Sequence, residues 1–260
     1  MNTSPITKIQ TALTLGTYEL KGQFMLGSNY TFFVDVHYEG VEYPAVYKPC
    51  KGEQPLWDFP DNTLAQREVA AYLLSEQLGL HIVPVTILRE DGPHGRGSLQ
   101  QYIEYDVDYH YFNFTEDDKN LLQPVMLFDI LINNADRKGS HIFFENDTHK
   151  LYAIDHGVCF HEENKLRTVI WDFAGQAIPD ELLASLSQTD NWPSLFESYL
   201  SPGEVTALKR RAEKLLTSKV YPRAREIGAR FHTHPYNQIR LRKSALTNKS
   251  HEDSKKTSEV

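Results

Sequence analysis

An apolar segment of eight residues places the strongest constraint on how this chain of 260 residues can fold. From Val125 to Ile132 every position is apolar except Asp129. A helix that is apolar on nearly every face is normally buried. The segment runs without a break into the polar residues Asn133 to His141. The sequence therefore predicts a buried helix that leads directly into a polar loop.

A β-hairpin is predicted directly after this loop. Ile142–Phe144 and Leu151–Ile154 have the composition of strands, and Asn146-Asp147 between them favours a turn. Because a hairpin brings its two ends together, Asp136 in the loop and Asp155 after the second strand can converge on one point. Phosphoryl transfer needs such a pair, one carboxylate to orient the attacking hydroxyl and one to hold a divalent metal.

The N-terminal part of the chain is predicted to form an antiparallel sheet. Residues 32–37 alternate between two faces, and a turn at Glu39-Gly40 leads into a strand over residues 43–48. Two further strands are expected, over residues 81–88 and 98–104. Pro84 favours an edge position for the first of these, because proline cannot donate to a sheet ladder.

One helix accompanies this sheet in the prediction. Thr63 and Gln66 have the spacing of a capping box, which predicts a helix over residues 63–78. Glu68 lies in its second turn, 20 residues after Lys48 at the end of a strand. A strand lysine can reach nucleotide phosphates if a helix carboxylate holds it in place, although a strand lysine and a helix glutamate are more often simply exposed.

Gly27, Ser28 and Asn29 form a small-residue turn two strands before Lys48. The backbone N–H groups of such a turn can cover phosphates. Each of these features is weak alone. The joint order of turn, lysine, helix glutamate, loop aspartate and strand-end aspartate is much rarer, and it favours a nucleotide site.

The second half of the chain is predicted to be mostly helical. Residues 105–114 look irregular and suit a link between two lobes. Thr115 can cap a helix, and Ser201 with Glu204 forms a capping box that opens a helix to about Leu216. Residues 166–173 are distinctive but suggest no chemistry, so we expect them to pack against the metal-binding loop at Asp155.

The charge of the chain is distributed unevenly. Residues 1–202 carry 13 Lys and Arg against 29 Asp and Glu, whereas residues 203–243 carry 11 against 3. An acidic body argues against nucleic-acid binding. The basic segment can face an anionic surface, but a solvated helix face that compensates the acidic body is the preferred interpretation.

Other features of the sequence suit a cytoplasmic protein. No apolar run approaches the length of a membrane span, and residues 1–10 do not have the layout of a secretion signal. Cys50 and Cys159 are the only cysteines, and they lie far apart in the sequence. Two isolated cysteines fit a reducing compartment better than a disulfide scaffold.

At these motifs the sequence resembles the phosphatidylinositol 3/4-kinases. The resemblance is greatest to the type II phosphatidylinositol 4-kinases and their bacterial kinase-like relatives, and it extends in outline to the HipA-type protein kinases. The catalytic and metal motifs are matched by Asn134–His141 and Ile154–Gly157. The nucleotide lobe is matched by Val46–Pro49, Arg67–Tyr72 and Gly79–Val85.

The resemblance implies an α+β, two-lobed protein-kinase-like fold. The expected parts are a nucleotide-binding N-lobe over residues 1–104, a catalytic C-lobe over residues 105–243 and a disordered tail over residues 244–260. The implied activity is transfer of the γ-phosphoryl group of ATP to a hydroxyl of a lipid, protein or small molecule.

The resemblance also implies roles for individual residues. Lys48 would bind the ATP phosphates and Glu68 would position it, while Asp136 would be the catalytic base and Asp155 a metal ligand. The strand beside the adenine would contain Gln101, Tyr102 and Ile103.

His141 departs from the family pattern, which has asparagine as the second metal ligand. A neutral imidazole can bind a divalent metal but suits Mn²⁺ better than Mg²⁺, which prefers oxygen. Two alternatives therefore stay open: a nucleotide-binding pseudokinase that regulates a partner, and transfer of AMP in place of phosphate.

Overall fold

The computed structural model describes residues 5–24, 30–226 and 228. All of them belong to one compact unit, Met1–Arg230. The predicted turn Gly27-Ser28-Asn29 and the predicted tail over residues 244–260 lie outside the described residues.

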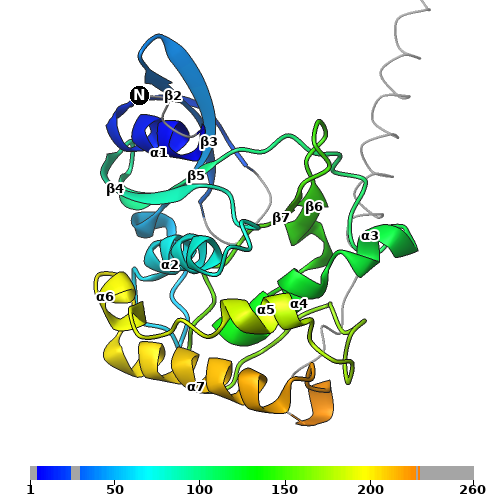
Figure 1. Ribbon diagram of the computed structural model, residues 1–260. Coiled ribbons are helices and arrows are strands. Elements are labelled where there is room, and N and C mark those ends of the chain that lie inside the picture. Colours follow the sequence, from blue (N-terminus) through cyan, green and yellow to red (C-terminus); the bar gives the residue numbers. More distant parts are fainter. Residues whose placement is uncertain (1–4, 25–29, 227, 229–260) are drawn as a thin grey trace, which may run out of the picture. The chain divides into compact units, whose positions relative to one another are not determined.

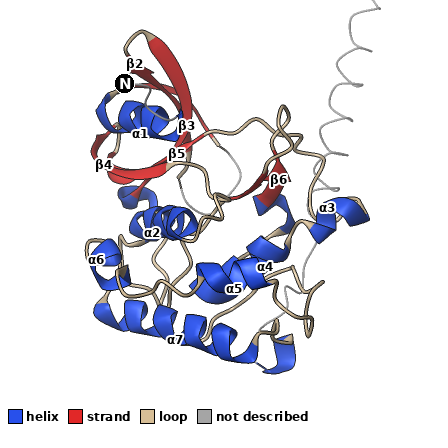
Figure 2. Cartoon of the chain, in the orientation of Figure 1, coloured by secondary structure: helices blue, strands red, loops and turns tan. Residues whose placement is uncertain are grey.

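A five-stranded antiparallel sheet forms the N-terminal part of the molecule (Figures 1 and 2). The strands lie in the order β1-β2-β3-β5-β4. They are β1 (Thr17–Gln23), β2 (Phe32–Tyr38), β3 (Val41–Pro49), β4 (Thr86–Gly92) and β5 (Gly95–Gln101). The turn between β2 and β3 has positive φ at both Glu39 and Gly40, which is the usual geometry of a two-residue hairpin. β4 lies at an edge, as predicted, but it begins at Thr86, after Pro84, and not at residue 81.

Two helices pack against this sheet, although the sequence predicted only the second. α1 (Pro5–Leu15) contacts β2 and β4, and α2 (Leu64–Gln77) contacts β4 and β5. The predicted capping box at Thr63 is wrong, because the Thr63 side chain makes no cap hydrogen bond. The carboxylate of Glu53 instead accepts from the backbone N–H groups of Leu64 and Ala65, at 3.1 and 2.9 Å.

Helices and one small hairpin make up the rest of the described chain (Figure 2). The helices are α3 (Glu116–Asn120), α4 (Gln123–Ile132), α5 (Asp180–Ser185), α6 (Trp192–Phe196) and α7 (Pro202–Ser218); the hairpin is β6 (Ile142–Phe144) with β7 (Leu151–Ala153). Short 3₁₀ turns are η1 (Cys50–Gly52), η2 (Gly139–His141) and η3 (Ala224–Glu226). The predicted caps at Thr115 and at Ser201–Glu204 both form.

α4 is the centre of the C-terminal part, and its residues from Val125 to Ile132 are all buried, as predicted. α7 packs alongside it (Figure 1). One continuous apolar core extends from the sheet through α2 and α4 to α7. The predicted α+β class, with an N-terminal antiparallel sheet and a mostly helical C-terminal part, is thereby confirmed. Each helix in the described ranges is too short or too polar to cross a lipid bilayer.

Candidate active site

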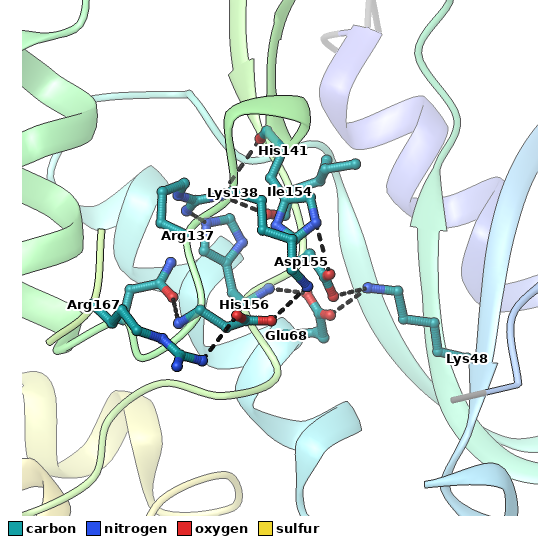
Figure 3. A network of polar contacts seen from close by, with 11 residues as sticks. Lys48, Glu68, Arg137, Lys138, His141, Ile154, Asp155, His156 and Arg167 are labelled. Atoms are coloured by element: carbon teal, nitrogen blue, oxygen red, sulfur yellow. Dashed lines mark hydrogen bonds and ion pairs between the residues drawn. The ribbon is translucent and has the colours of Figure 1, made fainter. Parts of the chain in front are cut away.

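Lys48, near the end of β3, lies between two carboxylates from distant parts of the chain (Figure 3). Its Nζ donates to Glu68 Oε1 on α2 at 2.5 Å and to Asp155 Oδ1 after β7 at 3.0 Å. The Glu68 side chain is only 3% exposed, whereas that of Asp155 is 44% exposed. Lys48 is thus in direct contact with Glu68 and Asp155, the two residues that their order along the sequence grouped with it.

The charges of this cluster stabilise one another. Burial alone would lower the pKa of Lys48, but the carboxylates of Asp155 and Glu68 outweigh it and raise that pKa above its ordinary value. The positive charge of Lys48 in turn holds the pKa of Asp155 well below its usual range, against the effect of burial. Both groups are therefore charged at neutral pH.

The backbone at residues 155–157 is fixed by α2. The His156 N–H donates to Glu68 Oε2 at 2.9 Å, so Glu68 holds both Lys48 and this backbone. Asp155 itself takes a positive φ of 65°, a conformation that non-glycine residues rarely adopt. A Cβ at Gly157 would lie 3.3 Å from Leu64 Cβ, so glycine at this position permits the close approach of α2.

His141 lies beside Asp155, as a shared metal site would require. Its Nε2 is 3.2 Å from Asp155 Oδ2. Burial lowers the pKa of His141 to about 4, only partly offset by the charge of Asp155, so the imidazole is neutral at neutral pH. Its Nδ1 is buried and has no hydrogen-bond partner among the described residues.

A carboxylate oxygen and a neutral imidazole nitrogen fit a divalent cation that takes its remaining ligands from phosphates and water. The described residues contain no group of three or more His, Cys, Asp or Glu side chains arranged for a metal. Asp155 and His141 therefore form at most a partial metal site, which suits a cation that arrives with a nucleotide.

Asp136 lies in the loop that follows α4 and is held between two cations. Its Oδ2 is 2.6 Å from Lys138 Nζ, and its Oδ1 is 3.2 Å from Arg167 Nη2. Its backbone N–H donates to Asn134 Oδ1 at 2.9 Å. The charge of Lys138 also contributes to the lowered pKa of Asp155, so the surroundings of Asp136 and Asp155 are electrostatically linked.

A buried ion pair that the sequence analysis did not identify supports this loop. Asp129 of α4 and Arg137 are both fully buried, and Arg137 Nε lies 3.1 Å from both carboxylate oxygens. Arg137 also donates to Ile154 O at 2.6 Å and to His156 Nε2 at 2.7 Å (Figure 3). Asp129, the single polar position in an apolar helix, was the sequence feature that could have revealed this pair.

Residues 166–173 bond to the loop after α4, whereas packing against the loop at Asp155 was expected, and they contribute a polar contact that was not anticipated. Arg167 N–H donates to Asn134 O at 2.8 Å, and Arg137 N–H donates to Arg167 O at 3.1 Å. Thr168 Oγ1 donates to Asp129 Oδ2 at 2.9 Å. Through these bonds the segment positions the Arg167 guanidinium against Asp136.

The residues predicted to line the adenine lie where β5 ends: Gln101 is its last residue, and Tyr102 and Ile103 follow it. Gln101 N–H and Tyr102 N–H donate to Val85 O and Pro44 O, at 2.8 and 3.0 Å. Ile103 is buried and packs with Phe143 and Tyr152. Their role in nucleotide binding stays a prediction.

Comparison with known proteins places the chain in a kinase-like context. No protein-family model matches it. "Protein Rv2133c" of Mycobacterium tuberculosis (strain ATCC 25618 / H37Rv) is 38% identical over 247 residues, covering 80% of this chain and 88% of that protein.

Two solved structures share the fold at low sequence identity. The proinflammatory kinase CtkA of Helicobacter pylori has a TM-score of 0.51 and 14% identity, covering 80% of this chain and 94% of its own. Hydra Fam20, solved with sugar, has a TM-score of 0.50 and 13% identity, covering 90% of this chain and 95% of its own. These likenesses establish a kinase-like fold but do not distinguish a phosphoinositide kinase from other kinds.

Proposed function

The chain belongs to the family of the mycobacterial protein Rv2133c, and from its kinase-like fold we propose that it is an ATP-dependent phosphotransferase. The observation that carries the proposal is the position of Lys48, whose Nζ contacts Glu68 and Asp155 at once. A kinase needs a lysine that a helix glutamate holds beside a metal-binding aspartate. In this chain, those three side chains come from β3, α2 and the end of the β6–β7 hairpin.

In this proposal Lys48 binds the ATP phosphates, and Glu68 keeps its ammonium group in place. Asp155 and His141 hold Mg²⁺ or Mn²⁺, and when bound the cation neutralises negative charge on the phosphates. The imidazole nitrogen at this position favours Mn²⁺. Gln101, Tyr102 and Ile103 border the adenine.

Asp136 is the proposed catalytic base. One of its carboxylate oxygens accepts the proton of the acceptor hydroxyl while that hydroxyl oxygen attacks the γ-phosphorus. Lys138 and Arg167 contact this carboxylate and add positive charge where the phosphoryl group passes. The acceptor is a lipid, a protein or a small molecule, and motif resemblance favours the phosphoinositide 3/4-kinase type among these.

We further propose a nucleotide lobe over residues 1–104 and a catalytic lobe over residues 105–243. A cytoplasmic location is supported by Cys50 and Cys159, which are both buried free thiols.

The test uses the purified chain of 260 residues with ATP labelled on the γ- or the α-phosphate and with Mg²⁺ or Mn²⁺. We expect γ-label transfer that Asp136→Asn lowers by about 10²–10⁴-fold. Asp147→Asn, an exposed carboxylate in the hairpin turn, is the matched control and should keep full activity.

Other outcomes separate the alternatives. Transfer of α-label with loss of pyrophosphate identifies AMP transfer. Nucleotide binding without turnover under either metal contradicts the enzyme and supports a pseudokinase, for which His141 in place of asparagine is the favouring feature.

A further inference from the structure

A cavity of about 380 Å³ lies in the C-terminal part of the molecule, away from the candidate active site. Its walls come from α4, α7, residues 162–166 and residues 222–226. The volume is within the range of pockets that hold small organic ligands. No residue of the Lys48–Glu68–Asp155 cluster lines it.

Three basic residues of α7 line this cavity: Arg210, Arg211 and Lys214. Within the part of the chain that the structure describes, none of the three has a carboxylate partner within ion-pair distance. The nearby carboxylate of Glu204 is already paired with Arg67, at 2.6 Å. Because Arg210 and Lys214 are also exposed, their charged groups can meet a ligand from solvent.

Arg211 provides a charge that the protein compensates only in part. Its Nε donates to Leu131 O at 2.7 Å and its Nη1 to His161 O at 3.2 Å. Its Nη2 is buried and has no hydrogen-bond partner among the described residues. Burial lowers the pKa of Arg211 to about 10, so the guanidinium is still charged at neutral pH. A buried cation without a counter-ion is costly, and an anion nearby would offset that cost.

Two acidic residues also line the cavity, but neither neutralises these cations. Glu226 binds Arg223, with Oε1 3.3 Å from Arg223 Nη1. The Glu162 carboxylate lies against Gly203 in the first turn of α7.

The remainder of the wall is apolar and includes Ile130, Leu166 and Leu215. We propose that this cavity binds an organic anion, whose phosphate or carboxylate group pairs with Arg210 and Lys214 in the field of Arg211 and whose apolar part packs on Ile130, Leu166 and Leu215. This site is independent of the kinase reaction proposed above, since it uses none of the same residues.

The experiment is calorimetric titration of the chain of 260 residues, without nucleotide, with phenyl phosphate, phenol and inorganic phosphate. Phenyl phosphate supplies both the charge and the apolar part, and each of the other two probes supplies one of them. We expect phenyl phosphate to bind at least about tenfold more tightly than either, because phenol lacks the charge-assisted contact and inorganic phosphate lacks the apolar area that would be buried.

Variants test whether phenyl phosphate binds in this cavity. The double variant Arg210→Gln, Lys214→Gln should weaken phenyl phosphate binding by about tenfold or more. Lys209→Gln is the matched control, because Lys209 is on the same helix but lines a separate hollow with Val205 and Thr206. Its affinity should equal that of the unmodified chain. Urea unfolding of each variant verifies that it is folded.

Three results would overturn the proposal: phenyl phosphate does not bind to the unmodified chain, the double variant binds it as tightly as the unmodified chain does, or Lys209→Gln loses as much affinity as the double variant. If inorganic phosphate bound as tightly as phenyl phosphate, the proposed apolar contacts would be wrong. If phenol bound as tightly as phenyl phosphate, the proposed contacts to the anionic group would be wrong.

Discussion

Two groups of charged residues lie next to each other at the loop after α4, and they differ in their exposure. Asp129 and Arg137 are fully buried, and their polar atoms bond to other protein groups. Lys48 and Asp155 are also paired, but nearly half of the Asp155 side chain faces solvent. The first pair can only hold the loop in place. The second can exchange a protein partner for a ligand, which a binding site requires.

Arg137 and Lys138 allow this comparison to be tested at consecutive positions. Arg137→Leu would leave the Asp129 carboxylate buried without its cation. Removing one partner of a buried pair typically costs about 3–5 kcal/mol of unfolding free energy. We expect a loss of that size in urea denaturation.

Lys138→Gln is the matched control, because Lys138 pairs with Asp136 while 50% exposed. Exposed pairs contribute about 1 kcal/mol or less, so this variant should unfold almost as the unmodified chain does. If Arg137→Leu and Lys138→Gln lost the same unfolding free energy, burial would not determine what an ion pair contributes to stability.

The open cluster was predictable from sequence, and the buried pair was not. Lys48, Glu68 and Asp155 each stand at a recognisable place relative to a strand, a helix or a hairpin, so their order alone suggested their convergence. The partners of Asp129 are Arg137, eight residues on, and Thr168, 39 residues on. No local pattern links Asp129 to Thr168, because only the packing of residues 166–173 against the loop brings them together.

β1 was given no residue range from the sequence, although Tyr18 and Leu20 alternate with polar neighbours, and nearly all of its residues are exposed. The error in capping α2 has the same origin as the missed ion pair. The cap of α2 was assigned to Thr63 because the capping-box spacing is local. The group that caps the helix is Glu53, which reaches it across a loop. The spacing that suggested the cap is therefore local, whereas the group that forms it lies outside the helix and before it in the chain.

Acid should weaken the fold through His141. Its pKa is about 4 in the folded protein and near 6.5 in an unfolded chain. Above pH 6.5 the imidazole is neutral in both states and contributes no pH dependence. As the pH falls towards 4, the unfolded state gains a proton that the folded state does not, so the folded state loses roughly 3 kcal/mol of relative stability by pH 4.

The measurement compares the unmodified chain with His141→Gln in urea unfolding between pH 7 and pH 4, with a chelator present. Carboxylates titrate in both proteins, so the difference between the two curves isolates His141. The unmodified chain should lose more stability as the pH falls. Parallel curves would mean that His141 is as accessible to protons in the folded chain as in the unfolded one.

Arg167 forms a separate ion pair with Asp136, which is also partly exposed, and the effect expected from changing it is the smallest. Arg167 is 42% exposed and contacts Asp136 Oδ1 and Ala135 O, so we infer that it positions the catalytic carboxylate. Arg167→Gln should lower kcat by about tenfold, equivalent to 1.4 kcal/mol of barrier, and leave the KM for ATP unchanged. Its unfolding free energy should change by less than about 1 kcal/mol. Arg96→Gln, which breaks the similarly exposed pair with Glu90, is the control and should keep full kcat. If Arg167 is only structural, Arg167→Gln changes the unfolding free energy and leaves kcat unaltered. If Arg167 binds the nucleotide, the variant raises the KM for ATP. The separate values of kcat and KM therefore decide its role.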